Sequence, residues 1–232
     1  METTITIYHG SQYVIEKPIF GEGNPRNDYG LGFYCTHDIG LAKEWACTSE
    51  SSGYANIYEL DTSELITMHL SGGEFNILNW LAILLKNRTF NINNDIAVEG
   101  YAYLIDNFLP DINLIDLIIG YRADDSYFSF ANAFLNNTLS LEQLENAMYL
   151  GKLGEQTVII SEKGFSHIKF IGSEFAERDV FFPMKTSRDS EARLAYRRGR
   201  AQRRASDSTY LIDILREGWS NDDERIRRNV SG

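Results

Sequence analysis

The hydrophobic period of the chain changes twice along its length, and this change limits most strongly which folds it can adopt. Residues 4–9 (TITIYH) and 54–60 (YANIYEL) alternate as strands do, and residues 31–36 read as a further strand. From about residue 64 to 150 apolar residues recur at helical spacing, whereas residues 157–160 and 167–171 again read as strands. Strands, then a helical block, then strands favour an α+β fold over a doubly wound parallel sheet.

Local signals place the helices and divide the chain. Asp38 can cap a helix through residues 41–46, and Ser140 can start the last helix of the block. Residues 16–26 carry two prolines and two glycines and are expected to form a loop. An arginine-rich helix is expected after residue 187. We therefore expect a domain over residues 1–183 with a helical insertion at about 64–150, and a helical C-terminal extension over 184–232.

Composition excludes several classes of protein. A hydrophobic content of 43% is enough for a core, and the net charge of −11 opposes non-specific binding to nucleic acid. Cys35 and Cys47 are expected to be free thiols of a reducing compartment. The first residues lack the basic and apolar segments of a signal peptide, and the apolar run 78–85 is too short to span a bilayer. We therefore expect a cytoplasmic protein with no membrane partner.

Common catalytic signatures are absent from the sequence. It has no phosphate-binding GxxxxGK[ST] loop, no GxGxxG, no GxSxG and no HExxH. The four histidines are scattered without a second ligand at metal spacing, so no metal site is expected.

Two short motifs near the start carry the chemical signal. Tyr8-His9-Gly10-Ser11 ends the first strand, and Gly30-Leu31-Gly32-Phe33-Tyr34 leads into the second, with Trp45 eleven residues further on. Glycine after the histidine allows a ligand to come close to the backbone. Taken singly, each feature more often has an ordinary structural role: a histidine that makes a hydrogen bond, a core strand, and a core tryptophan.

Together, these motifs resemble the poly(ADP-ribose)-polymerase-like branch of the ADP-ribosyltransferase superfamily. The stretches NDYGLGFYCTHDIGLAKEWA, GYRADDSYFSFANAFL and QTVIISEKGFSHIKF resemble an uncharacterised bacterial family within that branch. The resemblance covers residues 5–172. It implies a split, mixed or antiparallel β core with a large helical insertion and a C-terminal helical tail, and it implies NAD as the substrate.

The resemblance also assigns roles to individual residues. It implies that His9 donates a hydrogen bond to a ribose hydroxyl and that the backbone of Gly10 binds the nicotinamide carboxamide, with Ser11 in the same turn. Tyr34 would stack on the nicotinamide ring, and Trp45 would be the second stacking aromatic. A flat cation is well held between π faces, and cleavage of the glycosidic bond develops positive charge on the sugar.

The sequence departs from this pattern at the strand over residues 157–160. Members that build polymers have a glutamate at the head of that strand, where alignment of the apolar run places Gln156 and not Glu155. A shift by one residue would send the side chain to the opposite face of the sheet. A carboxylate about 4 Å from the developing cation contributes on the order of 4 kcal/mol at an effective dielectric constant of about 20. Gln156 therefore disfavours chain elongation and leaves single transfer or hydrolysis open.

Three other charged positions have open interpretations. Asp125 is a candidate auxiliary acid that replaces the missing glutamate, or it caps a helix together with Asp124. Arg26 and Asp28 are candidates to contact the pyrophosphate and the histidine, or they belong to a solvated loop.

The segment Arg188–Arg204 has seven arginines against two carboxylates. It fits a helix face that is solvated or paired within the chain, a docking surface for an acidic neutralising protein, or a track for nucleic acid.

These observations lead to a functional hypothesis with two alternatives. The leading hypothesis is an NAD-dependent mono-ADP-ribosyltransferase, of the toxin or effector kind, that modifies a protein or nucleic acid. The first alternative is an NAD glycohydrolase, which uses water as the acceptor in the same pocket. The second is a catalytically inactive module that binds NAD, ADP-ribose or a protein.

Overall fold

The computed structural model describes residues 3–72, 74–122, 125–148, 154–202 and 208–229. Its strands are β1 (Thr4–Ser11), β2 (Phe33–Cys35), β3 (Gly53–Asp61), β4 (Thr67–His69), β5 (Leu117–Tyr121), β6 (Glu155–Ile159) and β7 (Ile168–Ala176). Its helices are α1 (Ile39–Ala46), α2 (Ile77–Asn87), α3 (Asp95–Phe108), α4 (Asp125–Leu135), α5 (Leu141–Met148), α6 (Glu162–Ser166), α7 (Arg178–Gln202), α8 (Leu211–Glu217) and α9 (Glu224–Asn229). The protein is an α+β protein, as the change of period predicts.

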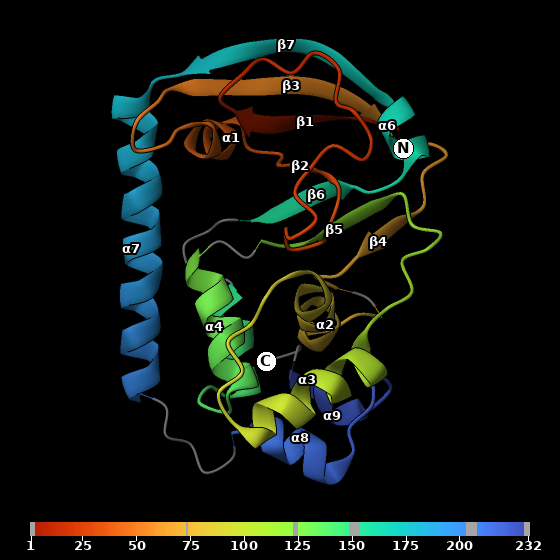
Figure 1. Ribbon diagram of the computed structural model, residues 1–232, viewed down its shortest axis with the longest axis vertical. Coiled ribbons are helices and arrows are strands. Elements are labelled where there is room, and N and C mark those ends of the chain that lie inside the picture. The colour runs from red at the N-terminus through yellow and green to blue at the C-terminus, as the bar shows by residue number, and fades with distance from the viewer. Residues whose placement is uncertain (1–2, 73, 123–124, 149–153, 203–207, 230–232) are drawn as a thin grey trace.

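The strands form two sheets that meet at one point. One sheet has the order β1-β3-β7 and is antiparallel, and the other has the order β2-β6-β5-β4, in which only β4 and β5 are parallel. An isolated bridge joins β1 to the segment after β2, because Tyr8 and Thr36 exchange backbone hydrogen bonds of 2.8 and 2.9 Å. Figure 1 shows the two sheets stacked, with β1 and β2 between their outer strands.

Helix α1 packs closely against the first sheet, and two glycines make this contact possible. A Cβ on Gly10 would lie 2.1 Å from the backbone oxygen of Ala42, and one on Gly53 would lie 2.3 Å from that of Ala46. The Asp38 carboxylate caps this helix by accepting hydrogen bonds from the backbone of Gly40 and Leu41, as the sequence predicts. The helix thereby carries Trp45 to the end of β1.

The helical block differs from its prediction because it also contains two strands. Residues 117–121 form β5 inside the second sheet, where β4 also lies, and the expectation of an entirely helical segment over 64–150 is therefore wrong. The reason is that a short apolar run has no period that separates a buried strand from a buried helix. Helix α2 is buried from Ile77 to Leu85, as expected for a helix that is apolar on all sides. In Figure 1 it lies under β4 and β5.

The C-terminal part packs against the rest of the chain. Helix α7 begins at Arg178 and crosses the expected boundary between residues 183 and 184, with Pro183 inside it. Leu211, Trp219 and Ile226 lie in the same buried cluster as α2 and α3. In Figure 1, α7 runs along one side of the molecule, next to α1 and α4.

Two findings concern the cysteines and the surface. Cys35 and Cys47 are both buried and free, and burial raises the pKa of each thiol.

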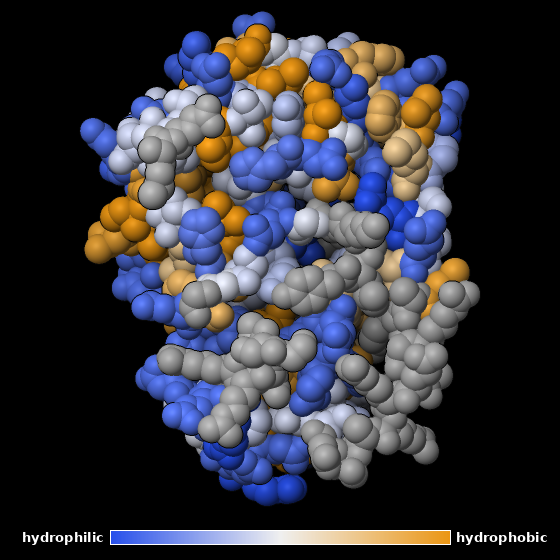
Figure 2. Space-filling model, turned by 180° about the vertical axis from the view of Figure 1, so that it is seen from behind, coloured by the Kyte–Doolittle hydropathy of each residue, from blue (hydrophilic) through white to orange (hydrophobic). Residues whose placement is uncertain are grey.

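No helix of the described residues is long and apolar enough to cross a membrane. On the face shown in Figure 2, apolar side chains reach the surface mainly in the upper half of the molecule.

Candidate functional site

A cavity of about 380 Å³ lies beside the point where the two sheets meet. Strands β1, β2 and β6, helices α1 and α7, and the segments beside them contribute its lining. The lining residues are His9, Gly10, Asn27, Asp28, Tyr34, Trp45, Arg88, Arg122, Gln156 and Lys185. Six of these ten residues were singled out from the sequence, although they come from separate parts of the chain. We call this cavity the cleft.

His9 lies on the wall of the cleft, and its ring is fixed on two sides. The imidazole stacks on Phe33 with 4.4 Å between ring centroids, and its Nδ1 lies 2.7 Å from the backbone oxygen of Tyr34. A carbonyl oxygen can only accept, so Nδ1 carries the proton. Burial lowers the pKa of His9, which keeps the ring neutral near pH 7.

This tautomer changes the role expected for His9. A neutral ring that is protonated at Nδ1 has an acceptor at Nε2. His9 would therefore accept a hydrogen bond from a ribose hydroxyl and not donate one to it.

Gly10 presents backbone groups to the cleft, but the reason for the glycine differs from the expectation. Its missing side chain makes room for α1, as described above, and not for a ligand. The backbone N–H and C=O of Tyr8 bond to Thr36, so they point away from β3. In an antiparallel strand every second residue points its backbone groups to the same side, so the N–H and C=O of Gly10 also point away from β3. Neither group has a hydrogen-bond partner among the described residues. Ser11 lies outside the lining of the cleft, and its hydroxyl accepts from the backbone N–H of Tyr13.

Tyr34 is held at its far end by the loop that precedes β2. Its hydroxyl donates to the Gly30 oxygen over 2.6 Å and accepts from the Tyr29 N–H over 3.1 Å. Gly30 has a φ of 74°, which favours glycine at this position. Burial raises the pKa of the Tyr34 hydroxyl, which therefore stays neutral. The ring is a fixed, uncharged wall of the cleft.

Trp45 makes a cation–π contact with Arg122 that the sequence did not predict. The guanidinium carbon of Arg122, at the end of β5, lies 3.7 Å from the centre of the indole ring. The indole Nε1 is buried without a hydrogen-bond partner among the described residues. The indole face thus already binds one flat cation within the cleft.

The structure distinguishes Gln156 from Glu155. Gln156 is 3% exposed and lines the cleft, whereas Glu155 is exposed on the other side of β6 and accepts a hydrogen bond from the Ser71 hydroxyl. Gln156 and Tyr34 share a face of the second sheet, since Tyr34 pairs with Val158, two residues further along β6. Of the two alternatives, only the neutral amide lines the cleft.

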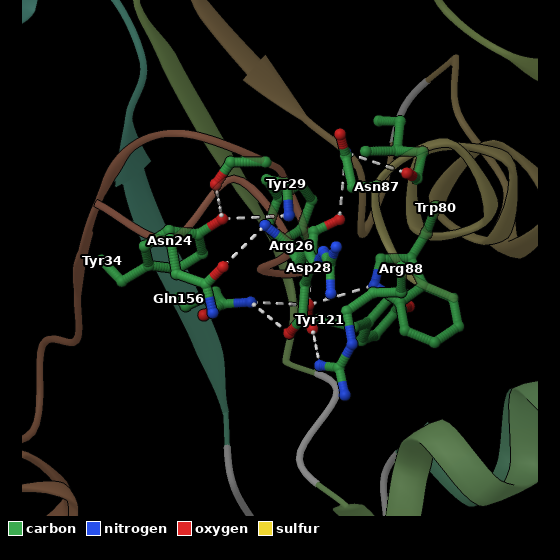
Figure 3. Close-up of polar contacts among 12 residues, drawn as sticks. Asn24, Arg26, Asp28, Tyr29, Tyr34, Trp80, Asn87, Arg88, Tyr121 and Gln156 are labelled. Carbon is green, nitrogen blue, oxygen red and sulfur yellow. Dashed lines mark hydrogen bonds and ion pairs between the residues drawn. The ribbon is translucent and has the colours of Figure 1, made fainter. Parts of the chain in front are cut away.

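An ion pair between buried Asp28 and partly exposed Arg88 lies behind Gln156. The Asp28 carboxylate, 7% exposed, accepts from Arg88 over 2.7 Å and from the Gln156 Nε2 over 3.3 Å. The same Nε2 donates to the backbone oxygen of Tyr121 over 3.3 Å. Figure 3 shows Gln156, Asp28 and Arg88 in a continuous chain of contacts. Asp28 is therefore a buried residue and not part of a solvated loop.

The other candidates lie away from the cleft or outside the described residues. Arg26 is exposed and does not line the cleft. Asp125 is the first residue of α4, and its side chain lies outside the described residues. In the Arg188–Arg204 segment, Arg188 pairs with buried Glu44 over 2.7 Å and Arg193 with Asp189 over 3.0 Å. The other arginine side chains of that run, apart from exposed Arg197, lie outside the described residues.

A second cavity, of about 590 Å³, adjoins the cleft under the loop after β1. The two cavities share His9, Asn27 and Tyr34. Asn56 tethers the start of that loop, since its Oδ1 accepts from the Ile15 N–H over 2.9 Å. An extended ligand could therefore pass from one cavity to the other beside His9 and Tyr34.

Comparison with known proteins gives one match. A family model described as protein of unknown function (DUF3990) matches residues 5–170. No curated protein and no solved structure matches the chain. No group of three or more metal-ligating side chains is found in the described part of the chain.

Proposed function

The chain belongs to the DUF3990 family, whose model covers residues 5–170 and with them all of the cleft lining except Lys185, and we propose that it is an NAD-dependent mono-ADP-ribosyltransferase. In this proposal the two sheets joined at Tyr8 and Thr36 are the split β core of an ADP-ribosyltransferase-like fold. Helices α2–α5, with β4 and β5, are its insertion. NAD is the substrate, and a protein or nucleic acid is the acceptor.

The observation that carries the proposal is the convergence of His9, Gly10, Tyr34, Trp45 and Gln156 on one cleft. These residues come from β1, β2, α1 and β6, and the sequence pattern selected them as a set. A structural role for each would not require them to line the same cavity. Their chemistry is that of a site for a flat amide-bearing cation: two aromatic faces, a free backbone donor and acceptor, and two polar side chains.

The groups of the cleft suggest how the bond to nicotinamide is broken. The Gly10 N–H and C=O would bind the carboxamide, and Tyr34 and Trp45 would hold the ring, with the pyridinium taking the place of Arg122 on the indole. His9 Nε2 would accept from a ribose hydroxyl. The sugar develops positive charge as nicotinamide leaves, and Gln156 Oε1 would stabilise it through a second hydroxyl.

The neutral residue at 156 favours single transfer over chain growth. A carboxylate in its place would supply roughly 4 kcal/mol at an effective dielectric constant of about 20. An amide keeps a hydrogen bond to the ribose but loses most of that attraction. The proposed reaction is therefore slow, single transfer of ADP-ribose.

The test uses NAD labelled in the adenylate group, incubated with the purified protein alone and with cell lysate. We expect release of nicotinamide and label on a protein or nucleic acid, both abolished by Tyr34→Ala. Tyr54→Ala is the matched control, because Tyr54 packs edge-on against Phe175 and does not line the cleft. Release without label transfer would favour the glycohydrolase. If neither release nor transfer occurs, the proposal is wrong, and binding of NAD alone would favour the inactive module.

A further inference from the structure

The neutral side chain of Gln156 has a buried carboxylate directly behind it. Asp28 contacts the Gln156 amide on one side and the Arg88 guanidinium on the other. All three side chains line the cleft. None of the sequence motifs predicts this arrangement, since Asp28 and Arg88 are 60 residues apart and Asp28 and Gln156 are 128 residues apart.

The polarity of these contacts fixes the orientation of the Gln156 amide. A guanidinium only donates hydrogen bonds, and an ionised carboxylate and a backbone carbonyl only accept them. Asp28 and the Tyr121 oxygen therefore both require the NH₂ group of Gln156, which turns Oε1 away from them. No hydrogen bond to Oε1 is found within the described residues. The amide thus keeps one acceptor for a ligand in the cleft.

We infer that Asp28, held by Arg88, is a positioning residue that fixes Gln156 with Oε1 available to accept a hydrogen bond from the ribose of NAD. This inference rests on the proposed function. The Asp28–Arg88 pair is neutral as a whole, so its contribution is orientation and not net charge. Hydrogen bonds to the sugar hydroxyl strengthen as the oxocarbenium-like state forms, so the orientation acts on kcat more than on KM.

The first variant replaces the hydrogen-bond acceptor that faces Gln156 with a donor. In Asp28→Asn, Arg88 donates its hydrogen bond to the amide oxygen of Asn. The NH₂ group of Asn then faces the NH₂ group of Gln156. Gln156 then either turns, which places a donor in the cleft and Oε1 against the Tyr121 oxygen, or keeps its NH₂ group against that of the new Asn; in both cases Oε1 is no longer held toward the ribose. We expect kcat for nicotinamide release to fall on the order of a hundredfold, with KM for NAD nearly unchanged. Asp179→Asn is the matched control, because Asp179 forms an exposed ion pair with Arg178.

The second variant restores the polarity by exchanging the two groups. In Asp28→Asn with Gln156→Glu, the NH₂ group of Asn donates to a carboxylate oxygen of Glu, whose other oxygen can face the ribose, although the hydrogen bond to the Tyr121 oxygen is lost. We expect most of the lost kcat to return. A residue that served only to stabilise the fold would not be rescued in this way.

Gln156→Glu alone provides a further readout, the pH profile of kcat. Two carboxyl groups in contact cannot both ionise readily, so one pKa rises. The other ionisable groups that line the cleft or lie beside this pair are Arg88, Arg122, Lys185, Tyr29, Tyr34 and His9. Burial raises the pKa of both tyrosines and lowers that of His9. We expect kcat of this variant to rise with pH across the neutral range, and the double variant to lose that dependence.

The outcomes separate this inference from the proposed function. If the unaltered protein releases no nicotinamide, the proposed function fails and the inference fails with it. If it is active but Asp28→Asn keeps its kcat, or the double variant recovers nothing, the inference alone is overturned. Thermal unfolding of each variant checks folding, and if Asp28→Asn does not fold, the pH profiles of Gln156→Glu and the double variant decide.

Discussion

The guanidinium of Arg122 lies over the indole of Trp45 at 3.7 Å, inside the cleft. A flat cation therefore already occupies the face that the proposed function assigns to the pyridinium ring. Ligand binding must displace Arg122, which costs roughly 1 kcal/mol for an exposed cation–π contact.

Arg122→Ala should therefore bind nicotinamide more tightly, by roughly fivefold for about 1 kcal/mol. Isothermal titration with nicotinamide measures this without involving the phosphates of NAD. Arg225→Ala is the matched control, because Arg225 stacks on Trp219 at 4.5 Å, a residue that does not line the cleft. Weaker binding by Arg122→Ala would mean that Arg122 holds the ligand.

Gly10→Ala should prevent the close packing of β1 on α1. The new Cβ would lie 2.1 Å from the Ala42 backbone oxygen, and backbone atoms cannot move aside. We expect a loss of about 3 kcal/mol or more in the free energy of unfolding, since overpacking against a side chain already costs about 1–3 kcal/mol. Denaturant titration measures it. Gly172→Ala, which meets no atom within 4 Å, should cost little.

The Arg188–Glu44 pair should be the most important contact between α7 and α1. Glu44 is 2% exposed, so Arg188→Ala leaves a buried charge without its partner, at a cost of about 3 kcal/mol in unfolding free energy. Arg193→Ala breaks the exposed pair with Asp189 and should cost about 0.5 kcal/mol or less. Equal losses of unfolding free energy for the two substitutions in urea titrations would contradict the importance of the Arg188–Glu44 pair.

His9 should make folding stability depend on pH. Burial lowers its pKa in the folded state below the ordinary value of 6.5, so the unfolded chain binds the proton more readily. This contribution to stability is fully present above pH about 6.5 and is lost as pH falls from there toward the lowered pKa. The free energy of unfolding should therefore fall less steeply between pH 7 and 5 in His9→Gln than in the unaltered protein. If the free energy of unfolding depended on pH in the same way in both proteins, a lowered pKa of His9 in the folded state would be contradicted.

The sequence predicted those elements whose signals are local. The alternation over residues 4–9 and 54–60, and Asp38 before a helix, depend on neighbouring residues only, and β1, β3 and α1 form accordingly. Strand β5 was missed because Leu117–Tyr121 is apolar throughout and is buried within a sheet. Helix α7 begins nine residues before the expected arginine-rich start, and Pro183 lies inside it, within its first two turns.

Cleft residues that lie close together in the sequence could be anticipated, whereas contacts between distant segments were missed. His9, Gly10, Tyr34 and Trp45 lie within the first 50 residues, and the resemblance of their two motifs to a known family singled them out. The ion pair of Asp28 with Arg88 and the stacking of Arg122 on Trp45 join separate elements, so no spacing indicates them. Which of Glu155 and Gln156 faces the cleft depends on the register of β6, and that register is given by its pairing with β5.

The most direct test of the account is the chemical-shift response of the labelled protein to nicotinamide. We expect saturable shifts of the Gly10 backbone amide and the Trp45 indole N–H, while the indole signals of Trp80 and Trp219, which do not line the cleft, stay in place. Shifts that leave Gly10 and Trp45 unchanged, or no shifts at all, would contradict a nicotinamide site between β1, β2 and α1.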